Sequence, residues 1–598
     1  MRKLLSGNEA LALGAYHAGI RLAAAYPGTP STEILENLAR FEDIHTQWST
    51  NEKVAMEVAI GAAYTGVRAL ATMKHVGLNV AADPFMAVAI TGIKGGLVVL
   101  SADDPGMHSS QGEQDNRFFA KFAKVPLLEP ADSQEAYDLM RWAFEISEAF
   151  DTPVMVRSTT RISHSKTIVE TREPEKIERK PAFVYDMAKY VMLPVNARFR
   201  RPLVEERLRK LADYSENFEF NRITWGDKKL GVITTGVAYQ YAREVFLEAS
   251  FLKIGMPFPL PEKLVREFAA GVSRVIVIEE LEPFIEEQIR LMGIAVEGKS
   301  FISNTGELST KIVVDGAVKA GLLSANDVAT TPAAANLTRR PPLLCSGCSH
   351  SGFYHVLSGL GGRAKLPGTE GKADRKPRLV ITGDIGCYTL GAYPPLSALD
   401  TTTCMGASIG EAVGMQKAGL AEKVVAVIGD STFMHSGITG LVNAVYNQSP
   451  ITVAILDNGT TAMTGHQEHP GTGVSASGQP AAKVEMEELV RGIGVREVSV
   501  VDAFDIKLLR QQLRAAIASP ELSVLIVRGE CAVRAPKGIR ASFVDTAKCD
   551  DCGVCLLIGC SAIQKKDRQV FIDANLCVGD ACTICCQVCP HQAIAARP

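Results

Sequence analysis

The chain has 598 residues, of which 46% are apolar and 22% are charged, and its net charge is −3. This composition is typical of globular proteins of roughly three to five domains, and it gives no reason to expect nucleic acid or an acidic membrane as a partner. No apolar stretch is long enough to span a bilayer, and Gly7 and Glu9 break the N-terminal apolar run too early for a signal peptide, so we expect a cytoplasmic protein. In that compartment the 14 cysteines are expected to be metal ligands or redox groups.

Residues 1–180 alternate strand and helix signals, which predicts a first α/β domain. The turn at residues 26–32 (YPGTPST) follows an apolar run, and Ser31 or Thr32 can cap the helix that starts there. The free N–H groups of such a helix start suit a carboxylate, which makes Thr29 and Ser31 candidates for binding an anionic substrate. The alternative is a capped surface turn without a ligand.

A helix rich in small residues is predicted over residues 51–62. It carries two carboxylates, Glu52 and Glu57, whose spacing of five places them on different faces. A helical Glu usually faces solvent, so the pattern alone does not identify a functional group.

The middle of the chain holds a charged stretch and a second α/β domain. Residues 181–228 are charged and irregular, so a solvated linker or a subunit contact is expected there rather than a basic groove. Apolar runs at 229–236 and 275–280 predict strands of another α/β domain, spanning 229–325, with no visible chemistry. Residues 326–342 are rich in Thr, Ala and Pro and are expected to be a linker.

The third α/β domain is expected over residues 343–535 and contains a strand–helix–strand unit. Residues 424–429 and 451–456 are buried, β-branched strand signals, and Ser436 can cap a helix between them. Such a unit makes the strands parallel, so Asp430 and Asn458 lie at the carboxyl ends of neighbouring strands, where open α/β sheets bind ligands. A carboxylate and an amide oxygen there suit a hard cation that also holds a diphosphate. The alternative is an ordinary turn between strand and helix.

Five cysteines of the chain lie outside its C-terminal region, and four of them can form one site. Cys345 and Cys348 form a Cys-x-x-Cys pair, and Cys387 and Cys531 lie at predicted strand ends. The fifth is Cys404. These four could form a four-cysteine site of the kind that holds an iron–sulfur cluster. A zinc site and separate buried thiols are the alternatives.

The C-terminal region, residues 540–598, contains the remaining nine cysteines in two runs. The first run is Cys-x2-Cys-x2-Cys-x4-Cys from Cys549 to Cys560, and the second is Cys-x4-Cys-x2-Cys-x3-Cys-Pro from Cys577 to Pro590. Interleaved triplets of this kind are typical of iron–sulfur clusters, and two zinc sites are the alternative.

The two cysteine runs together resemble a bacterial ferredoxin with two 4Fe–4S clusters, in which the fourth Cys of each run ligates the other cluster. The resemblance implies a first cluster on Cys549, Cys552, Cys555 and Cys589, and a second on Cys560, Cys577, Cys582 and Cys585. It leaves open whether Cys577 or Cys582 completes the second cluster. The sequence departs from the pattern in the longer spacing before Cys560, in Ser561 where Pro is usual, and in the extra Cys586.

The segment Gly429-Asp430-Ser431, followed by Asn458 one strand later, resembles the thiamine diphosphate (ThDP) fingerprint. The resemblance implies Mg²⁺ ligands from Asp430, Asn458 and the Thr460 carbonyl. It also implies that Glu52 is the catalytic carboxyl group that hydrogen-bonds the pyrimidine, in preference to Glu57. The further residues expected at ThDP are His350, Gly383, Asp384, Cys387, Gly429 and Ser431.

Together these motifs resemble the 2-oxoacid:ferredoxin oxidoreductases. The family fold has two doubly wound ThDP-type domains and a transketolase C-terminal-like α/β domain, here followed by a ferredoxin-like domain. In its pyruvate-specific members, Cys positions like 345, 348, 387 and 531 hold a third cluster near the cofactor. Residues 26–32, the segment from Gly429 to His435 and the cluster module look most like large subunits of the indolepyruvate-specific branch.

The resemblance implies ferredoxin-dependent oxidative decarboxylation of a 2-oxo acid, such as indolepyruvate, to the acyl-CoA and CO2. The small gamma-type domain of the superfamily has no counterpart in this sequence, so a separate small (beta) subunit is expected to supply it, in an assembly of two large and two small subunits. ThDP sites of this family usually lie between two chains. The alternatives are a non-oxidative ThDP-dependent decarboxylase and a non-catalytic electron-transfer subunit.

Overall fold

The computed structural model describes the chain except residues 175–179, 325–341, 364–378, 536–539, 568 and 597–598. The chain forms two compact units, Met1–Ala333 and Ala334–Pro598, which are described separately. The linker expected at 326–342 lies, apart from Pro342, outside the described residues.

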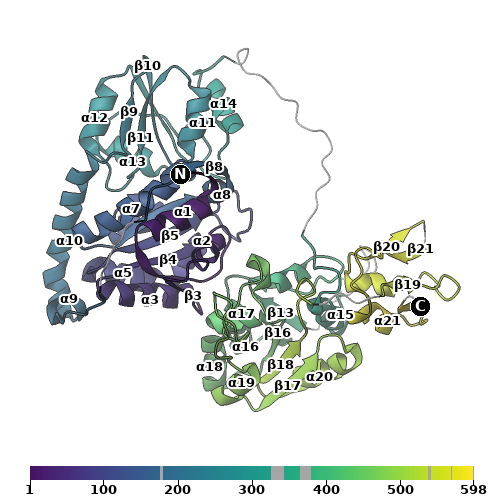
Figure 1. The fold of residues 1–598 in the computed structure, drawn as a ribbon. Coiled ribbons are helices and arrows are strands. Elements are labelled where there is room, and N and C mark those ends of the chain that lie inside the picture. The colour runs from purple at the N-terminus through teal and green to yellow at the C-terminus, as the bar shows by residue number, and fades with distance from the viewer. Residues whose placement is uncertain (175–179, 325–341, 364–378, 536–539, 568, 597–598) are drawn as a thin grey trace. The chain divides into compact units, whose positions relative to one another are not determined.

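The first unit begins with a six-stranded parallel sheet in the order β3-β2-β4-β5-β7-β6 (Figure 1). Helices cover both faces, because two separate apolar cores flank the sheet: one includes Met56 and Phe85, and the other Leu11, Leu35 and Phe144. A parallel sheet with helices on both faces is a doubly wound α/β arrangement. Its strands are β2 (Ile20–Ala25), β3 (His45–Trp48), β4 (Arg68–Lys74), β5 (Leu97–Asp103), β6 (Leu127–Leu128) and β7 (Val154–Thr159).

The helices of this domain start at recognisable caps. Ser6 and Glu9 form a capping box at α1, and Asn51 Oδ1 accepts a hydrogen bond from Val54 N (3.0 Å) at α3. The helices are α1 (Gly7–His17), α2 (Thr32–Leu38), α3 (Glu52–Tyr64), α4 (His75–Val80), α5 (Ala82–Thr91), α6 (Arg117–Ala123), α7 (Ser133–Phe150) and α8 (Thr160–His164). A two-stranded antiparallel pair, β1 (Arg2–Ser6) and β8 (Lys166–Glu170), closes the domain.

The segment expected to be an irregular linker, 181–228, instead contains the 22-residue helix α10 (Pro194–Ser215) and the short α9 (Met187–Tyr190). The arginines that suggested a solvated stretch partly face inward. Arg207 is buried and donates to Asp151 O (2.6 Å), and Arg200 Nη2 donates to Thr91 O (2.7 Å) at the end of α5. These guanidinium groups dock α10 on the first domain, so this part of the linker prediction is wrong.

A second, four-stranded sheet follows in the order β12-β10-β11-β9, with β9 antiparallel to the rest (Figure 1). Its strands are β9 (Arg222–Thr224), β10 (Asp227–Thr235), β11 (Ala249–Ile254) and β12 (Arg274–Ile278). The helices around it are α11 (Ala238–Val245), α12 (Glu262–Ala270), α13 (Phe284–Leu291) and α14 (Thr310–Lys319). The strands predicted at 229–236 and 275–280 correspond to β10 and β12.

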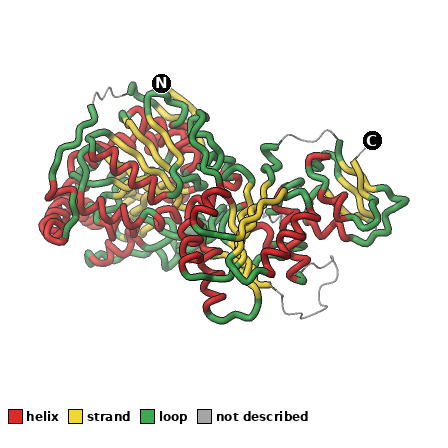
Figure 2. The backbone as a smooth tube through the Cα atoms, turned by 90° about the horizontal axis from the view of Figure 1, so that it is seen from below, coloured by secondary structure: helices red, strands yellow, loops and turns green. Residues whose placement is uncertain are grey.

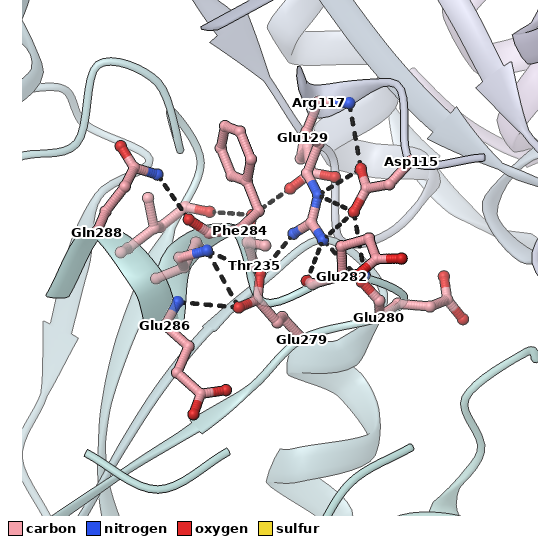
Figure 3. A network of polar contacts seen from close by, with 12 residues as sticks. Asp115, Arg117, Glu129, Thr235, Glu279, Glu280, Glu282, Phe284, Glu286 and Gln288 are labelled. Atoms are coloured by element: carbon pink, nitrogen blue, oxygen red, sulfur yellow. Dashed lines mark hydrogen bonds and ion pairs between the residues drawn. The ribbon is translucent and has the colours of Figure 1, made fainter. Parts of the chain in front are cut away.

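A buried ionic network joins the two sheets of this unit (Figure 3). Arg117 is fully buried at the start of α6 and donates through Nη1 to Glu279 Oε2 (2.7 Å) and through Nε to Asp115 Oδ1 (2.9 Å). Its Nη2 also donates to the carbonyl oxygens of Glu280 (2.7 Å) and Glu282 (3.0 Å), which follow β12. The guanidinium of Arg117 therefore ties the loop after β12 to the first domain.

Glu280 in this network makes the stability of the unit depend on pH. Burial raises the pKa of its carboxyl group to about 7, and its Oε2 has no protein partner among the described residues. Because this pKa lies above its ordinary value, unfolding releases the proton, and stability falls as pH rises from about 4.5 towards 7. We expect Glu280→Gln, which keeps the shape and cannot ionise, to match the wild-type thermal midpoint at pH 5 and to exceed it at pH 8. Equal midpoints at both pH values would contradict this expectation.

The second unit is built on another six-stranded parallel sheet, in the order β14-β13-β15-β16-β18-β17. Its strands are β13 (Leu379–Gly383), β14 (Thr401–Thr402), β15 (Lys423–Gly429), β16 (Thr452–Asp457), β17 (Glu497–Asp502) and β18 (Ser523–Arg528). Two apolar cores again flank the sheet. The helices are α15 (Ser349–Gly361), α16 (Ala407–Lys417), α17 (Asp430–Thr432), α18 (Ile438–Tyr446), α19 (Met486–Ile493) and α20 (Ile506–Ala518).

The parallel pairing predicted for the two strands of the ThDP-like unit is confirmed as β15 and β16. The helix between them differs from the prediction. It begins directly at Asp430, continues through a π-helical turn (Phe433–Gly437) and ends in α18. Ser436 lies inside the π-helical turn, so it is not the helix cap that we expected.

The C-terminal cysteine-rich region is formed mostly by loops around short elements (Figure 2). Strands β19 (Ser542–Val544) and β22 (Ile594–Ala596) pair antiparallel, as do β20 (Ile563–Lys566) and β21 (Gln569–Ile572). The region also contains the helix α21 (Ile584–Val588) and two 3-10 helices, η5 (Val554–Ile558) and η6 (Gly579–Ala581). None of the helices in the described part of the chain combines the length and apolar character needed to cross a bilayer.

Candidate cofactor and metal sites

Asp430 lies at the carboxyl end of β15, where it is 3% exposed and surrounded by donors. Its Oδ1 accepts from Ser431 N (2.8 Å), and its Oδ2 accepts from Gly459 N (2.8 Å) and Asn458 N (3.2 Å). Burial opposes the charge of this carboxylate, but the hydrogen bonds from His469 and the backbone lower its pKa. Asp430 is thus a carboxylate that stays ionised in a buried site, as a ligand of a hard cation must be.

Asn458 and Thr460 follow β16 and lie beside this carboxylate. Asn458 Oδ1 accepts from Thr460 N (3.1 Å), and Asn458 Nδ2 lies 3.4 Å from His350 Nε2. Burial lowers the pKa of His350 to about 4, partly offset by Asp430, so this imidazole is neutral. The three predicted Mg²⁺ ligands are therefore adjacent, and the oxygen donors that they offer fit Mg²⁺.

Two further residues, His469 and Tyr388, lie at the carboxyl edge of the sheet beside Asp430 and Gly429, and the sequence did not indicate either of them. His469 is 4% exposed, and its Nε2 lies 3.3 Å from Asp430 Oδ2. The ring of Tyr388 packs so tightly that a Cβ at Gly429 would lie 2.5 Å from Tyr388 Cε1. No spacing rule links either residue to the fingerprint, so the folded chain alone identifies them.

Asp384, at the end of β13, is fully buried and bonded to the protein itself. It accepts hydrogen bonds from Tyr388 OH and from Ser408 Oγ (2.7 Å), and burial raises its pKa to about 7. The Gly383–Asp384 turn therefore positions the Tyr388 ring against Gly429. Ser431 Oγ, in turn, lies 2.8 Å from Thr461 Oγ1.

Glu52 lies at the first position of α3 and is 5% exposed, whereas Glu57 is exposed and pairs with Lys53. The Glu52 side chain lies against Gly77 of α4, where an added Cβ would be 2.5 Å from Glu52 Oε1. A glycine at position 77 is thus what leaves room for the carboxyl group. The Glu52 carboxyl group is buried, as the ThDP resemblance implies, and its catalytic role stays a prediction.

The turn with Thr29 and Ser31 follows β2, at the same sheet edge as Glu52. The expected side-chain cap is not formed, because Ser31 Oγ donates back to Gly28 O (2.8 Å) and Thr32 Oγ1 accepts from Gly28 N (2.9 Å). The carbonyl oxygen of Thr29 accepts from Ser109 Oγ (3.3 Å) in the loop after β5. Substrate binding by Thr29 and Ser31 stays a prediction.

The C-terminal cysteines are gathered as the ferredoxin resemblance implies. The first four, Cys549, Cys552, Cys555 and Cys589, line one cavity. The second four, Cys560, Cys577, Cys582 and Cys585, line another. Cys586 is not among the lining residues of either cavity, and its Sγ lies 3.8 Å from Ser542 Oγ. Two enclosed sets of four thiols fit two cubane clusters, with both Cys577 and Cys582 at the second.

The third set also comes together in the second unit. Burial raises the pKa of Cys387 to about 12, and the neighbouring Cys531 and Cys345 add to this rise. Burial and the same neighbours, with Cys387, raise the pKa of Cys348. With pKa values raised in this way the thiols are neutral, and binding of a metal or cluster would deprotonate them. Cys404 is exposed and does not contribute to these shifts.

The third set adjoins two other sites of the unit, the predicted Mg²⁺ ligands and the second cysteine set. The backbone N–H of Cys531 donates to Asn458 O (3.2 Å), beside the predicted Mg²⁺ ligands. Cys348 also lines the cavity of the second cysteine set. The predicted Mg²⁺ ligands, the third cysteine set and the second cysteine set therefore lie next to one another in that order.

Two family models match the chain. The C-terminal TPP-binding domain of thiamine pyrophosphate enzymes matches residues 384–527, and the thiamine diphosphate-binding domain of pyruvate flavodoxin/ferredoxin oxidoreductases matches residues 13–223. These matches cover the domains that carry Asp430 and Glu52.

Several proteins resemble the whole chain. The indolepyruvate oxidoreductase subunit IorA of Archaeoglobus fulgidus is 41% identical over 99% of this chain and 97% of its own length. The IorA subunit of Methanothermobacter marburgensis is 40% identical, with the same coverage. A solved structure, the 2-oxoglutarate:ferredoxin oxidoreductase from Magnetococcus marinus with 2-oxoglutarate, coenzyme A and succinyl-CoA bound, matches with a TM-score of 0.45 and 17% identity, over 54% of this chain and 65% of that chain. From the near-complete matches at 40–41% identity, the chain belongs to the 2-oxoacid:ferredoxin oxidoreductase family, and it is similar over nearly its whole length to proteins named IorA subunits of indolepyruvate oxidoreductases.

Proposed function

We propose that this protein is the large subunit of an enzyme that oxidatively decarboxylates aryl pyruvates such as indolepyruvate, with coenzyme A as acyl acceptor and ferredoxin as electron acceptor. One observation carries the proposal: a buried carboxylate–amide pair suited to Mg²⁺ and a diphosphate lies on the same unit as two enclosed sets of four thiols. The printed names of the relatives support indolepyruvate as the substrate.

ThDP, when bound, supplies the carbanion that adds to the 2-oxo group and accommodates the electrons left after CO2 departs. The protein residues have separate tasks. Asp430, Asn458 and the Thr460 carbonyl hold Mg²⁺, and His350 faces the diphosphate as a neutral donor. Glu52 hydrogen-bonds the pyrimidine ring and shares its proton. The wall of the proposed ThDP site would be formed by Gly383, Asp384, Cys387, Gly429 and Ser431.

The overall reaction balances with two ferredoxin molecules. One 2-oxo acid anion, one CoA thiol and two oxidised ferredoxins give acyl-CoA, CO2, two reduced ferredoxins and one proton. One cluster would be held by Cys549, Cys552, Cys555 and Cys589, and another by Cys560, Cys577, Cys582 and Cys585. Such clusters would supply one-electron transfer towards ferredoxin. A third cluster on Cys345, Cys348, Cys387 and Cys531 would lie closest to the Mg²⁺ ligands, because Cys531 bonds the Asn458 backbone.

A small beta subunit is proposed to complete the enzyme, in a cytoplasmic assembly of two large and two small subunits. The relatives are named as subunits, which supports a partner chain. The exposed apolar side chains of Phe183, Tyr185 and Phe199 near α9 and α10 are compatible with a subunit contact in the first unit.

The first test is anaerobic spectroscopy of the protein with its small subunit, with indolepyruvate, CoA and ferredoxin added in turn. Bleaching of the cluster absorption by the substrate, with ThDP bound, would support the oxidoreductase. About twelve iron atoms per chain would support a third cluster, because each cubane holds four. Aldehyde formation without bleaching would instead favour the non-oxidative decarboxylase, and clusters without bound ThDP the electron-transfer subunit.

The assignment of the second cluster is tested by two adjacent cysteines. Cys585→Ser removes a thiol that lines the cavity, so we expect about four iron atoms fewer per chain, or a three-iron cluster with an altered EPR spectrum. Cys586→Ser is the matched control and is expected to keep the full iron content. A loss of iron in the Cys586 variant with none in the Cys585 variant would reverse the assignment.

A further inference from the structure

Lys74 is a buried cation at the edge of the first sheet where Glu52 and the Thr29 turn lie. It ends β4 and is 8% exposed. Among the described residues of 1–180, the buried cationic side chains are Arg68, Lys74, Arg117 and Arg157. The three arginines each pair with a carboxylate, whereas Lys74 has no carboxylate within ion-pair distance. A buried charge without a partner is costly, so its presence calls for an anion.

The nearby carboxylate, Asp104, does not fill this role. Its Oδ2 accepts from Ser109 N (2.8 Å) and Ser110 Oγ (2.5 Å), and its Oδ1 accepts from Thr160 Oγ1 (2.7 Å). These donors occupy the Asp104 oxygens and keep the loop after β5 folded. Asp104 offsets the burial of Lys74 only partly, and burial lowers the pKa of Lys74 to about 8.

The ammonium group of Lys74 lies next to the predicted substrate turn. Its Nζ donates to Ser109 O (2.6 Å) and reaches Ser109 Oγ (3.4 Å), and the same Ser109 hydroxyl donates to Thr29 O (3.3 Å). The stem of Lys74 lies along Gly28, where an added Cβ would be 3.0 Å from Lys74 Cβ. An ammonium has three donors, and the third has no protein acceptor among the described residues.

Building on the proposed function, we propose that Lys74 binds the carboxylate of the 2-oxo acid and thereby makes the enzyme specific for the acid. The carboxylate accepts the free donor of Nζ and neutralises this cation, which has no carboxylate partner among the described residues. Ser109 accepts a hydrogen bond from the Lys74 ammonium and donates one to Thr29 O, so it connects the proposed anion-binding group to the Thr29 turn. Lys74 is thus a substrate-binding residue, in addition to Thr29 and Ser31.

The test compares Lys74→Met, Lys74→Arg and a matched control in the complete enzyme with its small subunit. Lys74→Met is expected to raise the KM for indolepyruvate about 10- to 100-fold, the loss typical of a hydrogen bond to a charged group. The KM for CoA, the bound ThDP and the iron content are expected to stay unchanged. Lys74→Arg should restore part of the loss. The control is Lys299→Met, because Lys299 is another largely buried lysine with a pKa of about 8, bonded to the carbonyl oxygens of Glu279 and Ser303.

A second measurement separates charge recognition from a structural role. Indole-3-propionate and its neutral amide are compared as inhibitors against indolepyruvate. The wild-type enzyme is expected to bind the acid more tightly than the amide, and Lys74→Met is expected to lose this discrimination. An unchanged KM for indolepyruvate, or a raised KM for CoA alone, would overturn the proposal. A wild-type enzyme without substrate-driven bleaching would instead refute the proposed function, so the two failures are distinguishable.

Discussion

Glu52→Gln is expected to reduce turnover of the 2-oxo acid by about 10²- to 10⁴-fold while ThDP and iron stay bound, because glutamine keeps the shape but cannot share a proton. The structure places this carboxyl group 5% exposed at the start of α3, against Gly77. The measurement is the rate of cluster bleaching under saturating substrate, with ThDP and iron counted on the same sample.

Two further variants sharpen this test. Glu57→Gln removes an exposed carboxylate of the same helix and is expected to keep the wild-type rate. Gly77→Ala keeps Glu52 but places a methyl group 2.5 Å from its Oε1, so the carboxyl group must shift. A displacement near 1 Å costs on the order of 10²-fold in rate. Full activity of the Glu52 variant would refute its assignment as the catalytic carboxyl group.

Arg117→Met is expected to lower the free energy of unfolding of the first unit by about 3–5 kcal/mol, the usual result of leaving a buried charge without its partner. Asp115 and Glu279 would both remain buried without the guanidinium that they share. We expect the thermal midpoint of the corresponding transition to fall, with the iron absorption of the second unit unaffected in the folded protein.

The controls for this variant use other cations. Arg117→Lys keeps the charge but not the planar fork that reaches Asp115, Glu279 and two carbonyl oxygens at once, so an intermediate midpoint is expected. Arg201→Met removes an exposed arginine paired with Glu205 on α10 and is expected to change the midpoint little. A midpoint for Arg117→Met equal to that of Arg201→Met would contradict the role of the network.

Where a local pattern determines the structure, the sequence was sufficient. The β-branched runs at β15 and β16 allow few alternatives to parallel buried strands, and this pairing brings Asp430 and Asn458 together. The two C-terminal cysteine sets are what the ferredoxin resemblance implies, and in the folded chain each set lines a cavity of its own. Their role as cluster ligands stays a prediction.

Where long-range contacts determine the structure, the sequence was not sufficient. Helix α10 has the composition of a solvated segment, and long-range contacts hold it on the first domain: Arg200 and Arg207 donate to backbone carbonyls, and the side chains of Val204 and Leu211 are buried. The π-helical turn after β15 forms around Gly437, where a Cβ would lie 2.7 Å from Ile428 Cδ1. His469 approaches Asp430 from a loop that no strand or helix pattern connects to it.

The position of Cys348 has a consequence for how the enzyme matures. Cys348 belongs to the third cysteine set and also lines the cavity of the second cluster, and a Cβ on the preceding Gly347 would collide with Val578 between Cys577 and Gly579. The loop with Gly347 and Cys348 packs against the loop with Val578, so folding of either loop restricts the conformations of the other. If both cysteine sets bind clusters, as proposed above, we expect their loading to be cooperative, because a cluster bound at one set would lower the entropic cost of ordering the other. During biogenesis, we expect most chains to carry clusters at both the second and the third cysteine set or at neither. Few chains are expected to carry only one of these two clusters.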